Sequence, residues 1–182
     1  MKTRKKLLIT LIGLVMFIFI IAYYHGFFLS MNVVEKRDGG YVLAGLEFKG
    51  PYSEAGTHMD EVEQQLKKQG IFSERGFGVY YDNPENVKPE NCRSFLGVIL
   101  EKNDVSKAPI LKSVGLKLDS VPVGNSLQVS FPIRNSFSYM IGPKKAYPAL
   151  SRYLKEKNYE PDLTMEIYNT RSREIIFLIQ YH

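Results

Sequence analysis

The sequence predicts an α+β fold made of two copies of one strand–helix–strand–strand unit, preceded by a single transmembrane helix. The first observation is an apolar run near the N-terminus that is long enough to cross a bilayer. The second is a pair of amphipathic helix patterns, each followed by two short runs rich in β-branched and aromatic residues. Each unit alone would leave apolar surface exposed, so the two units are expected to pack into one domain.

The apolar run covers residues 7–29 and contains no Asp, Glu, Lys or Arg. A helix needs about 20 such residues to cross the hydrocarbon core. Tyr23 and Tyr24 follow its most apolar part, and tyrosine suits the boundary between membrane and water. A cleaved signal peptide also begins with basic and then apolar residues, but Ala22 is followed here by bulky tyrosines. The run is therefore interpreted as an uncleaved anchor rather than a signal sequence.

The charges beside the run predict its orientation. The flank, residues 1–6, contains four basic residues and no acidic one. The positive-inside rule then places the N-terminus in the cytoplasm and the domain on the outer side, periplasmic or lumenal. Without the flank, 20 basic residues face 19 acidic ones, so the net charge of +5 falls to +1. Nucleic-acid binding is not expected, because it needs a basic stripe on the domain.

The domain is expected over residues 41–182, after a linker at residues 30–40 that ends in two glycines. The repeat halves are expected at about 41–101 and 121–182. The first begins with a strand at residues 41–50, which a Gly-Pro pair closes.

A helix is expected after the first strand. Thr57 is the expected N-cap, and acidic side chains follow it. Two lysines stand near the end of the pattern, and Gly70 suits the position just after the helix. Residues 75–84 and 92–101 are then expected to form a strand pair.

The second half repeats this order. Strands are expected at residues 126–133 and 135–143, and Gly142-Pro143 closes the second of them. A helix at 146–158 and a strand pair at 163–169 and 174–182 follow. The shared Gly-Pro pairs strengthen the case for a duplication. Helices on one side of the joined sheets would leave a central groove on the other side, where a ligand would bind.

Several strings resemble those of the GyrI-like small-molecule-binding domains, which also serve as effector-binding modules of AraC- and MerR-type regulators. They are GPYSE at 50–54, YYDNPENVKPENCRSFLGVIL at 80–100, PALSRYLKEKNYEP at 148–161 and MEIY at 165–168. The resemblance runs from about residue 39 to the end, and the residues around Cys92 are closest to the GyrI-like domain of a vertebrate single-pass ER-phagy receptor. That receptor binds autophagy adaptors through a motif in a long acidic tail. This chain stops at His182, so binding of autophagy adaptors is not expected. A membrane-anchored protein-interaction scaffold stays open as an alternative.

The resemblance implies a role for Glu166. In this family the Glu of the E-x-Y string faces the groove and meets cationic or polar ligands, and in some members it is a catalytic carboxylate paired with a tyrosine. Tyr168 lies two residues on and therefore on the same strand face as Glu166. A non-catalytic, membrane-tethered module that binds a small amphipathic or cationic molecule is expected, and a hydrolase using Glu166 with Tyr168 is the alternative.

Other aromatic residues are candidates for the same binding site. Tyr80 and Tyr81 alternate along a strand, so one is expected to face inward, while Phe137 and Tyr139 are expected to share a face. Such rings suit a planar or cationic ligand. No metal or cofactor is expected, because the three histidines are scattered and no phosphate-binding glycine loop occurs in context. The one cysteine, Cys92, is expected to be buried and inert.

Overall fold

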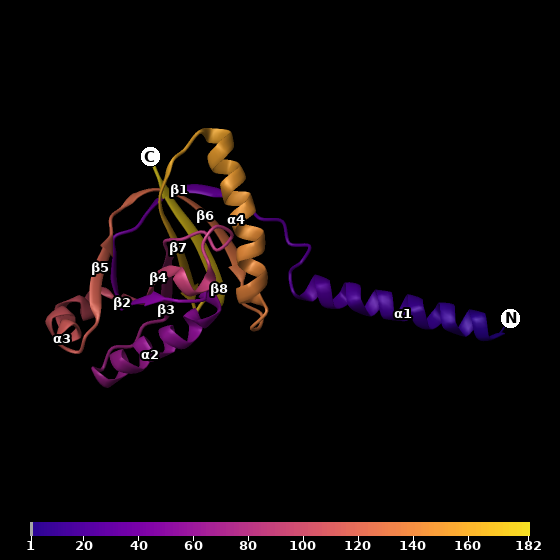
Figure 1. The fold of residues 1–182 in the computed structure, drawn as a ribbon, viewed down its shortest axis with the longest axis horizontal. Helices are drawn as coiled ribbons and strands as arrows, with labels where there is room; N and C mark the ends of the chain where they lie inside the picture. The colour runs from indigo at the N-terminus through magenta and orange to yellow at the C-terminus, as the bar shows by residue number, and fades with distance from the viewer. Residues whose placement is uncertain (1) are drawn as a thin grey trace.

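A computed structural model describes residues 2–182 as a curled, eight-stranded antiparallel sheet with an apolar N-terminal helix that extends away from it (Figure 1). The α-helices are α1 (Lys2–Tyr24), α2 (Ala55–Lys68), α3 (Ala108–Ser113) and α4 (Ser138–Lys157). The strands are β1 (Val34–Asp38), β2 (Tyr41–Lys49), β3 (Arg75–Tyr80), β4 (Arg93–Leu100), β5 (Lys117–Val121), β6 (Gly124–Pro132), β7 (Pro161–Asn169) and β8 (Glu174–Tyr181). Short 3-10 turns occur at Tyr52–Glu54, Pro89–Asn91 and Lys102–Lys107.

The expected duplication is confirmed. The unit β2-α2-β3-β4 is followed by the unit β6-α4-β7-β8, and the strand order across the sheet is β1-β6-β8-β7-β3-β4-β2-β5. Within residues 2–182 the two halves of the sheet are joined by the antiparallel pairing of β3 with β7 alone. In that pairing Gly76 lies opposite Tyr168 and Gly78 lies opposite Glu166.

The expected helix at α2 is confirmed, with a different start. The helix begins at Ala55, because the 3-10 turn before it leads directly into helical geometry, so Thr57 lies inside the helix rather than at its cap. Its end follows the prediction. Gly70 has a φ of +67°, and the amide of Ile71 donates to the carbonyl of Leu66, which closes the helix as a left-handed glycine usually does.

The strand expected at residues 135–143 is wrong, since this segment contains the start of α4. Asn135 accepts a hydrogen bond from the amide of Phe137, and the Ser138 hydroxyl accepts one from the amide of Arg134. These local bonds start a helix where the alternating pattern indicated a strand. Gly142 lies inside α4 and packs closely on the Phe177 ring, so it does not end a strand.

Part of the expected linker also differs, because residues 34–38 form β1. This strand pairs with β6 at one edge of the sheet and is rich in charged side chains, which are common on edge strands. Gly39 and Gly40 then turn the chain directly into β2, with φ values of +130° and +71°.

Two short connections force the sheet to curl. β1 lies at one edge and β2 lies one strand in from the other edge, yet Gly39 and Gly40 alone join them. Pro122 and Val123 likewise join β5 to β6. The side chain of Gln180 donates to the carbonyls of Asp38 and Pro122 and so holds the two connections together.

The helix-free face, where a groove was expected, is filled with buried side chains. This concave face carries one apolar cluster, composed of Leu43, Phe77, Val79, Phe95, Ile99, Val121, Met165, Ile167 and Leu178. Helices α2 and α4 cover the opposite, convex face through two further clusters. Met165 and Ile167 belong to this cluster, so the residue between them, Glu166, lies on the face that carries the helices.

Helix α1 is long and apolar enough to cross a membrane, and its apolar window is not buried by the domain. A signal sequence near an N-terminus meets the same criteria, and the orientation of the helix is not fixed by them. Figure 1 shows α1 leaving the domain on the side where α4 lies.

We predict that Gly97→Ala strongly destabilises the fold. A Cβ at Gly97 would lie 2.1 Å from the carbonyl oxygen of Ala44, on the neighbouring strand β2. Backbone atoms have to shift to relieve this clash, so we expect a loss of about 3 kcal/mol or more in the free energy of unfolding. Urea unfolding of the detergent-solubilised chain measures it.

Gly76→Ala is the matched control, because a Cβ there meets its nearest neighbour at an ordinary 3.7 Å. Its free energy of unfolding should change by about 1 kcal/mol or less. Equal stability of the two variants would contradict the close approach of β2 and β4.

Candidate functional site

Glu166 lies in the middle of β7, at the seam between the two halves of the sheet. Its side chain is 5% exposed and points to the convex face, together with Phe177 on β8. The residue opposite it on β3 is Gly78. A carboxylate is therefore buried where the two copies of the repeat meet, on the face that α2 and α4 cover.

Two tyrosine hydroxyls hold this carboxylate. Tyr147, from α4, donates to Oε1 at 2.7 Å, and Tyr168 donates to Oε2 at 2.6 Å. The hydroxyl of Tyr168 also lies 2.9 Å from that of Tyr80. Because Tyr168 has already given its one proton to Glu166, Tyr80 is the donor in this second bond.

Residues of the first half form the other wall of the site. A Cβ at Gly78 would lie 2.7 Å from the Tyr80 ring, so the absence of a side chain there lets this ring fold back along its own strand. The Tyr52 ring packs edge-on against Tyr80 with a centroid distance of 4.7 Å. The Tyr52 hydroxyl donates to the carbonyl of Asp82 at 2.9 Å, which fixes its position. Tyr147 and Tyr168 thus contact the carboxylate directly, while Tyr80 packs behind Tyr168 and Tyr52 packs behind Tyr80.

The electrostatics of the site follow from its burial. Burial raises the pKa of Glu166, while the hydrogen bonds from Tyr168 and Tyr147 act in the opposite direction. Burial and the nearby charge of Glu166 raise the pKa values of Tyr168 and Tyr147 well above that of an ordinary tyrosine. Both tyrosines therefore remain protonated donors. Within residues 2–182, no Lys, Arg or His side chain forms an ion pair with Glu166.

The structure brings some of the predicted site residues together and separates others. Glu166, Tyr168 and Tyr80 form the centre, and the exposed Tyr139 lies at the rim with its ring 5.8 Å from that of Tyr168. Phe137 is exposed and its ring lies 5.2 Å from that of His25, toward the end of α1. It does not face Glu166.

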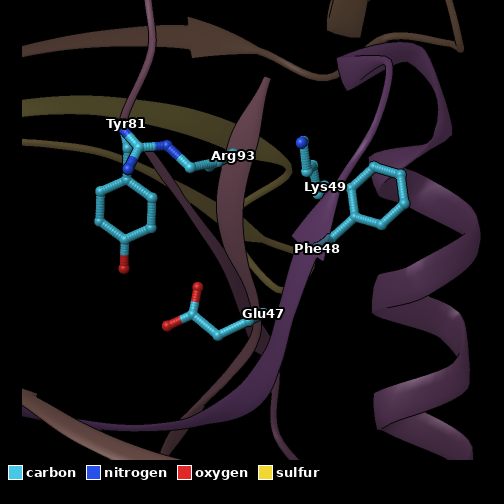
Figure 2. Close-up of a pocket in the computed structure, with 5 residues that line it drawn as sticks. All are labelled: Glu47, Phe48, Lys49, Tyr81 and Arg93. Carbon is cyan, nitrogen blue, oxygen red and sulfur yellow. The ribbon is translucent and has the colours of Figure 1, made fainter. Parts of the chain in front are cut away.

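Tyr81 is also exposed and points to the other side of the sheet from Tyr80. It lines an open hollow of about 480 Å³ together with Glu47, Phe48, Lys49 and Arg93. Figure 2 shows these five residues, with the Phe48 ring turned toward the helix beside it. A second hollow, beside α1, is lined by Phe19, Ile20, Tyr23 and Phe28. Neither hollow reaches Glu166, whose site is closed by its tyrosines.

Sequence reasoning missed Tyr52 and Tyr147 as site residues. Tyr52 belongs to the GPYSE string, which was used only for the family resemblance. Tyr147 lies on the apolar face of the helix expected at 146–158, where a core role already explained it. In the part of the chain that the structure describes, no group of three or more His, Cys, Asp or Glu side chains is placed to hold a metal ion. Cys92 is free and buried.

The sequence also matches a known protein family. Residues 31–175 match the family described as the GyrI-like small molecule binding domain. The chain belongs to the GyrI-like family. The resemblance that the sequence strings indicated is thereby confirmed.

Individual proteins also resemble parts of this chain. The chain is 34% identical over 100 residues to the testis-expressed protein 264 homolog of Mus musculus, and 33% identical over 99 residues to testis-expressed protein 264 of Homo sapiens. Each match covers 52% of this chain and 32% of the relative, so the matched part is about a third of those proteins. Among solved structures, the C-terminal domain of EcmrR aligns with a TM-score of 0.56 and 16% identity, over 83% of this chain and 96% of that one. This likeness shows a shared fold.

We predict that Glu166→Gln becomes more stable relative to the natural chain as the pH rises. Because the folded-state pKa of Glu166 is raised, the unfolded chain releases its proton first, and stability falls as the pH rises from the ordinary glutamate pKa through the folded one. Glutamine carries no charge and escapes this loss. The melting temperature of Glu166→Gln minus that of the natural chain should therefore increase from pH 4 to pH 8.

The exposed Glu156 on α4 provides the control. Glu156→Gln also removes one carboxylate but leaves the buried site intact, so it should not reproduce the gain expected for Glu166→Gln. If the natural chain instead gained stability over Glu166→Gln with rising pH, the folded-state pKa of Glu166 would have to be lowered.

Proposed function

We propose that the GyrI-like domain binds a small amphipathic cation at Glu166. The observation that carries this proposal is a buried carboxylate whose hydrogen-bond donors are neutral tyrosines and which pairs with no basic side chain in residues 2–182. An uncompensated charge in a poorly solvated site is costly, and an opposite charge placed beside it interacts more strongly than in water. A ligand that brings its own positive charge supplies the missing partner.

The surrounding rings favour a ligand with an apolar body. Tyr168 contacts the carboxylate, Tyr80 and Tyr52 continue the row of rings behind it, and Tyr139 extends this aromatic lining to the surface. Aromatic faces attract cations as well as apolar groups. The lining therefore fits a cation whose charge is attached to hydrophobic or planar groups better than it fits a small hydrated ion.

Binding requires the site to open. Tyr147 and Tyr139 come from α4, whereas Tyr52 comes from the turn before α2, so the cover of Glu166 is contributed by separate elements. A ring that swings outward gives up a hydrogen bond or a ring contact, and an incoming cation replaces it. Ser94, opposite Tyr80 in the β3–β4 pairing, supports this proposal, because its buried hydroxyl has no partner in the described residues. Leaving such a group unpaired is costly, and a polar ligand atom would satisfy it.

A hydrolytic function of the same carboxylate is the second candidate. The observation in its favour is the 2.6 Å distance between the Tyr168 hydroxyl and Glu166, which is within reach for acid–base catalysis. The two candidates differ in what happens to the ligand, since a binding module returns it unchanged.

We further propose that α1 tethers the domain to a membrane, with the N-terminus in the cytoplasm. The helix is apolar around its whole circumference and is not covered by the domain. Its basic flank at residues 1–6 supports the orientation.

We predict that hydrophobic cations such as tetraphenylphosphonium raise the melting temperature of the detergent-solubilised chain, and that Glu166→Gln abolishes the rise. At a ligand concentration of 100 times Kd, binding stabilises the folded state by about 2.7 kcal/mol. For a chain of this size the melting temperature should rise by roughly 5–10 °C. Neutral compounds of the same shape should give a much smaller shift.

The exposed-site variant Glu156→Gln is the control and should retain the full shift. Mass spectrometry of the recovered ligand separates binding from hydrolysis, because a hydrolase would convert strained or electrophilic compounds added in the same way. A panel that produces no shift in the natural chain would reject the cation site and favour the scaffold that binds a protein partner.

The proposed membrane tether is tested with a double variant that combines Leu14→Arg with Ile18→Arg. Each arginine in the middle of a membrane helix costs about 2.5–3.5 kcal/mol, so the double variant should be extracted from membranes by alkaline carbonate while the natural chain stays in the pellet. Leu14→Ala with Ile18→Ala is the control and should remain in the pellet. A pelleted chain should also show the mass of the intact polypeptide, 20.9 kDa, and a smaller mature mass would show that α1 is cleaved.

A further inference from the structure

The residues that follow α1 are packed against the beginning of α4. Arg134 donates a hydrogen bond to the carbonyl of Tyr24, and Asn135 lies 3.2 Å from the His25 ring nitrogen. The His25 ring in turn contacts the Phe137 ring at 5.2 Å. The domain is therefore not free on a flexible chain at this point, because one end of α4 is held next to the end of α1.

This contact sets the depth of the domain relative to a bilayer that α1 crosses. Tyr23 and Tyr24 end the helix and suit the boundary between membrane and water. His25 directly follows Tyr24, and the centroid of its ring lies 5.2 Å from that of the Phe137 ring. Phe137 therefore lies near the same boundary. Phe27 and Phe28, which follow, are both exposed.

The outward side of α4 continues from this point as one exposed row of residues. We call it the outer stripe, and its members, spaced three or four residues apart, are Phe137, Met140, Lys144, Pro148, Ser151 and Lys155. Its first members are apolar and lie at the end of α4 nearest to α1, whereas the later ones include two lysines. The helix as a whole carries five basic residues and one acidic residue.

A membrane surface matches this arrangement better than a protein partner does. The large apolar side chains are confined to the end of the stripe that is joined to α1, where hydrocarbon begins, and the basic ones follow where lipid phosphates would lie. A stable protein interface buries about 800 Å² on each partner around a central apolar core. Here the apolar residues instead lie at one end of the surface, beside the membrane helix.

We propose that the outer stripe of α4, together with Phe27 and Phe28, rests in the headgroup region of the bilayer that α1 crosses. Phe137 and Met140 insert at the boundary, and Lys144 and Lys155 lie against anionic lipid phosphates. This proposal rests on the membrane tether proposed above. It adds that the domain has one fixed face toward the membrane, and that the rim residue Tyr139 of the Glu166 site lies beside that face.

The chain contains no tryptophan, so Phe137→Trp introduces a single fluorescent reporter. The full-length variant is reconstituted into vesicles that contain anionic phospholipid with brominated acyl chains, which quench tryptophan at the membrane. Phe72→Trp is the matched control, because Phe72 is 71% exposed and follows the end of α2 that lies far from α1 (Figure 1). Quenching of the first variant should exceed that of the control at least about twofold, with emission at shorter wavelength, as expected for a ring buried about 5–10 Å into the interface.

A charge reversal tests the basic part of the stripe. In the Phe137→Trp chain, Lys144→Glu with Lys155→Glu should reduce quenching in anionic vesicles and have less effect in vesicles of neutral phosphatidylcholine. Met140→Trp, at the next position of the stripe, should be quenched like Phe137→Trp. It replaces Phe137→Trp as the fluorescent reporter if that substitution disturbs the fold.

Two outcomes would overturn the proposal and leave the tether intact. Weak lipid quenching of both stripe reporters, in a chain that resists alkaline extraction, would mean that the stripe faces water. Protection of the reporters from aqueous acrylamide without lipid quenching would mean that a protein or a second copy covers the stripe. A chain that alkali extracts would reject the tether itself, and this proposal with it.

Discussion

The antiparallel pairing of β3 with β7 is the constraint on which the rest of this structure depends. It is the one ladder that joins the two halves of the sheet within residues 2–182, and the two strands hold equivalent places in the two copies of the repeat. The copies are not identical at this seam. Where β7 carries Glu166 and Tyr168, β3 carries Gly78 and Gly76, so one copy leaves open the space that the side chains of the other copy occupy. A buried carboxylate is possible here because both partners of the duplication contribute to its surroundings.

Local signals in the sequence were enough to predict most of the elements. The charge pattern of α2 and the glycine that follows it identified the helix and its end, although not its N-cap, and the repeated order of elements identified the duplication. Local signals failed where tertiary contacts decide. The alternating residues before Gly142 resemble a strand, yet they belong to the helix α4, in which Gly142 packs on the Phe177 ring of β8. The charged residues 34–38 resemble a linker, yet they pair with β6 along an exposed edge.

The site was predictable in part for the same reason. The E-x-Y string singled out Glu166 and Tyr168, whose side chains are hydrogen-bonded to each other in the structure. Strand alternation correctly implied that Tyr80 and Tyr81 lie on opposite sides of the sheet. The face of the sheet on which the site lies was not predictable, because it depends on the curl. That curl follows from the pairing of distant strands and from two-residue connections whose geometry no local pattern describes. Tyr147 escaped notice because a tyrosine on the apolar side of a helix is usually a core residue, and here its ring packs on Phe177 while its hydroxyl reaches the carboxylate.

The two outermost strands of the sheet have a consequence for how copies of this protein coexist. β1, with the sequence VEKRD, and β5, with the sequence KLDSV, are short, and both place charged side chains along the open edges. An unpaired edge is a template onto which another chain can add a strand, and closely spaced charges oppose such an addition. Molecules confined to a surface diffuse in two dimensions and meet far more often than they do in solution. With the membrane tether proposed above, short and charged edges would allow many copies to be crowded on one membrane without joining into a continuous sheet.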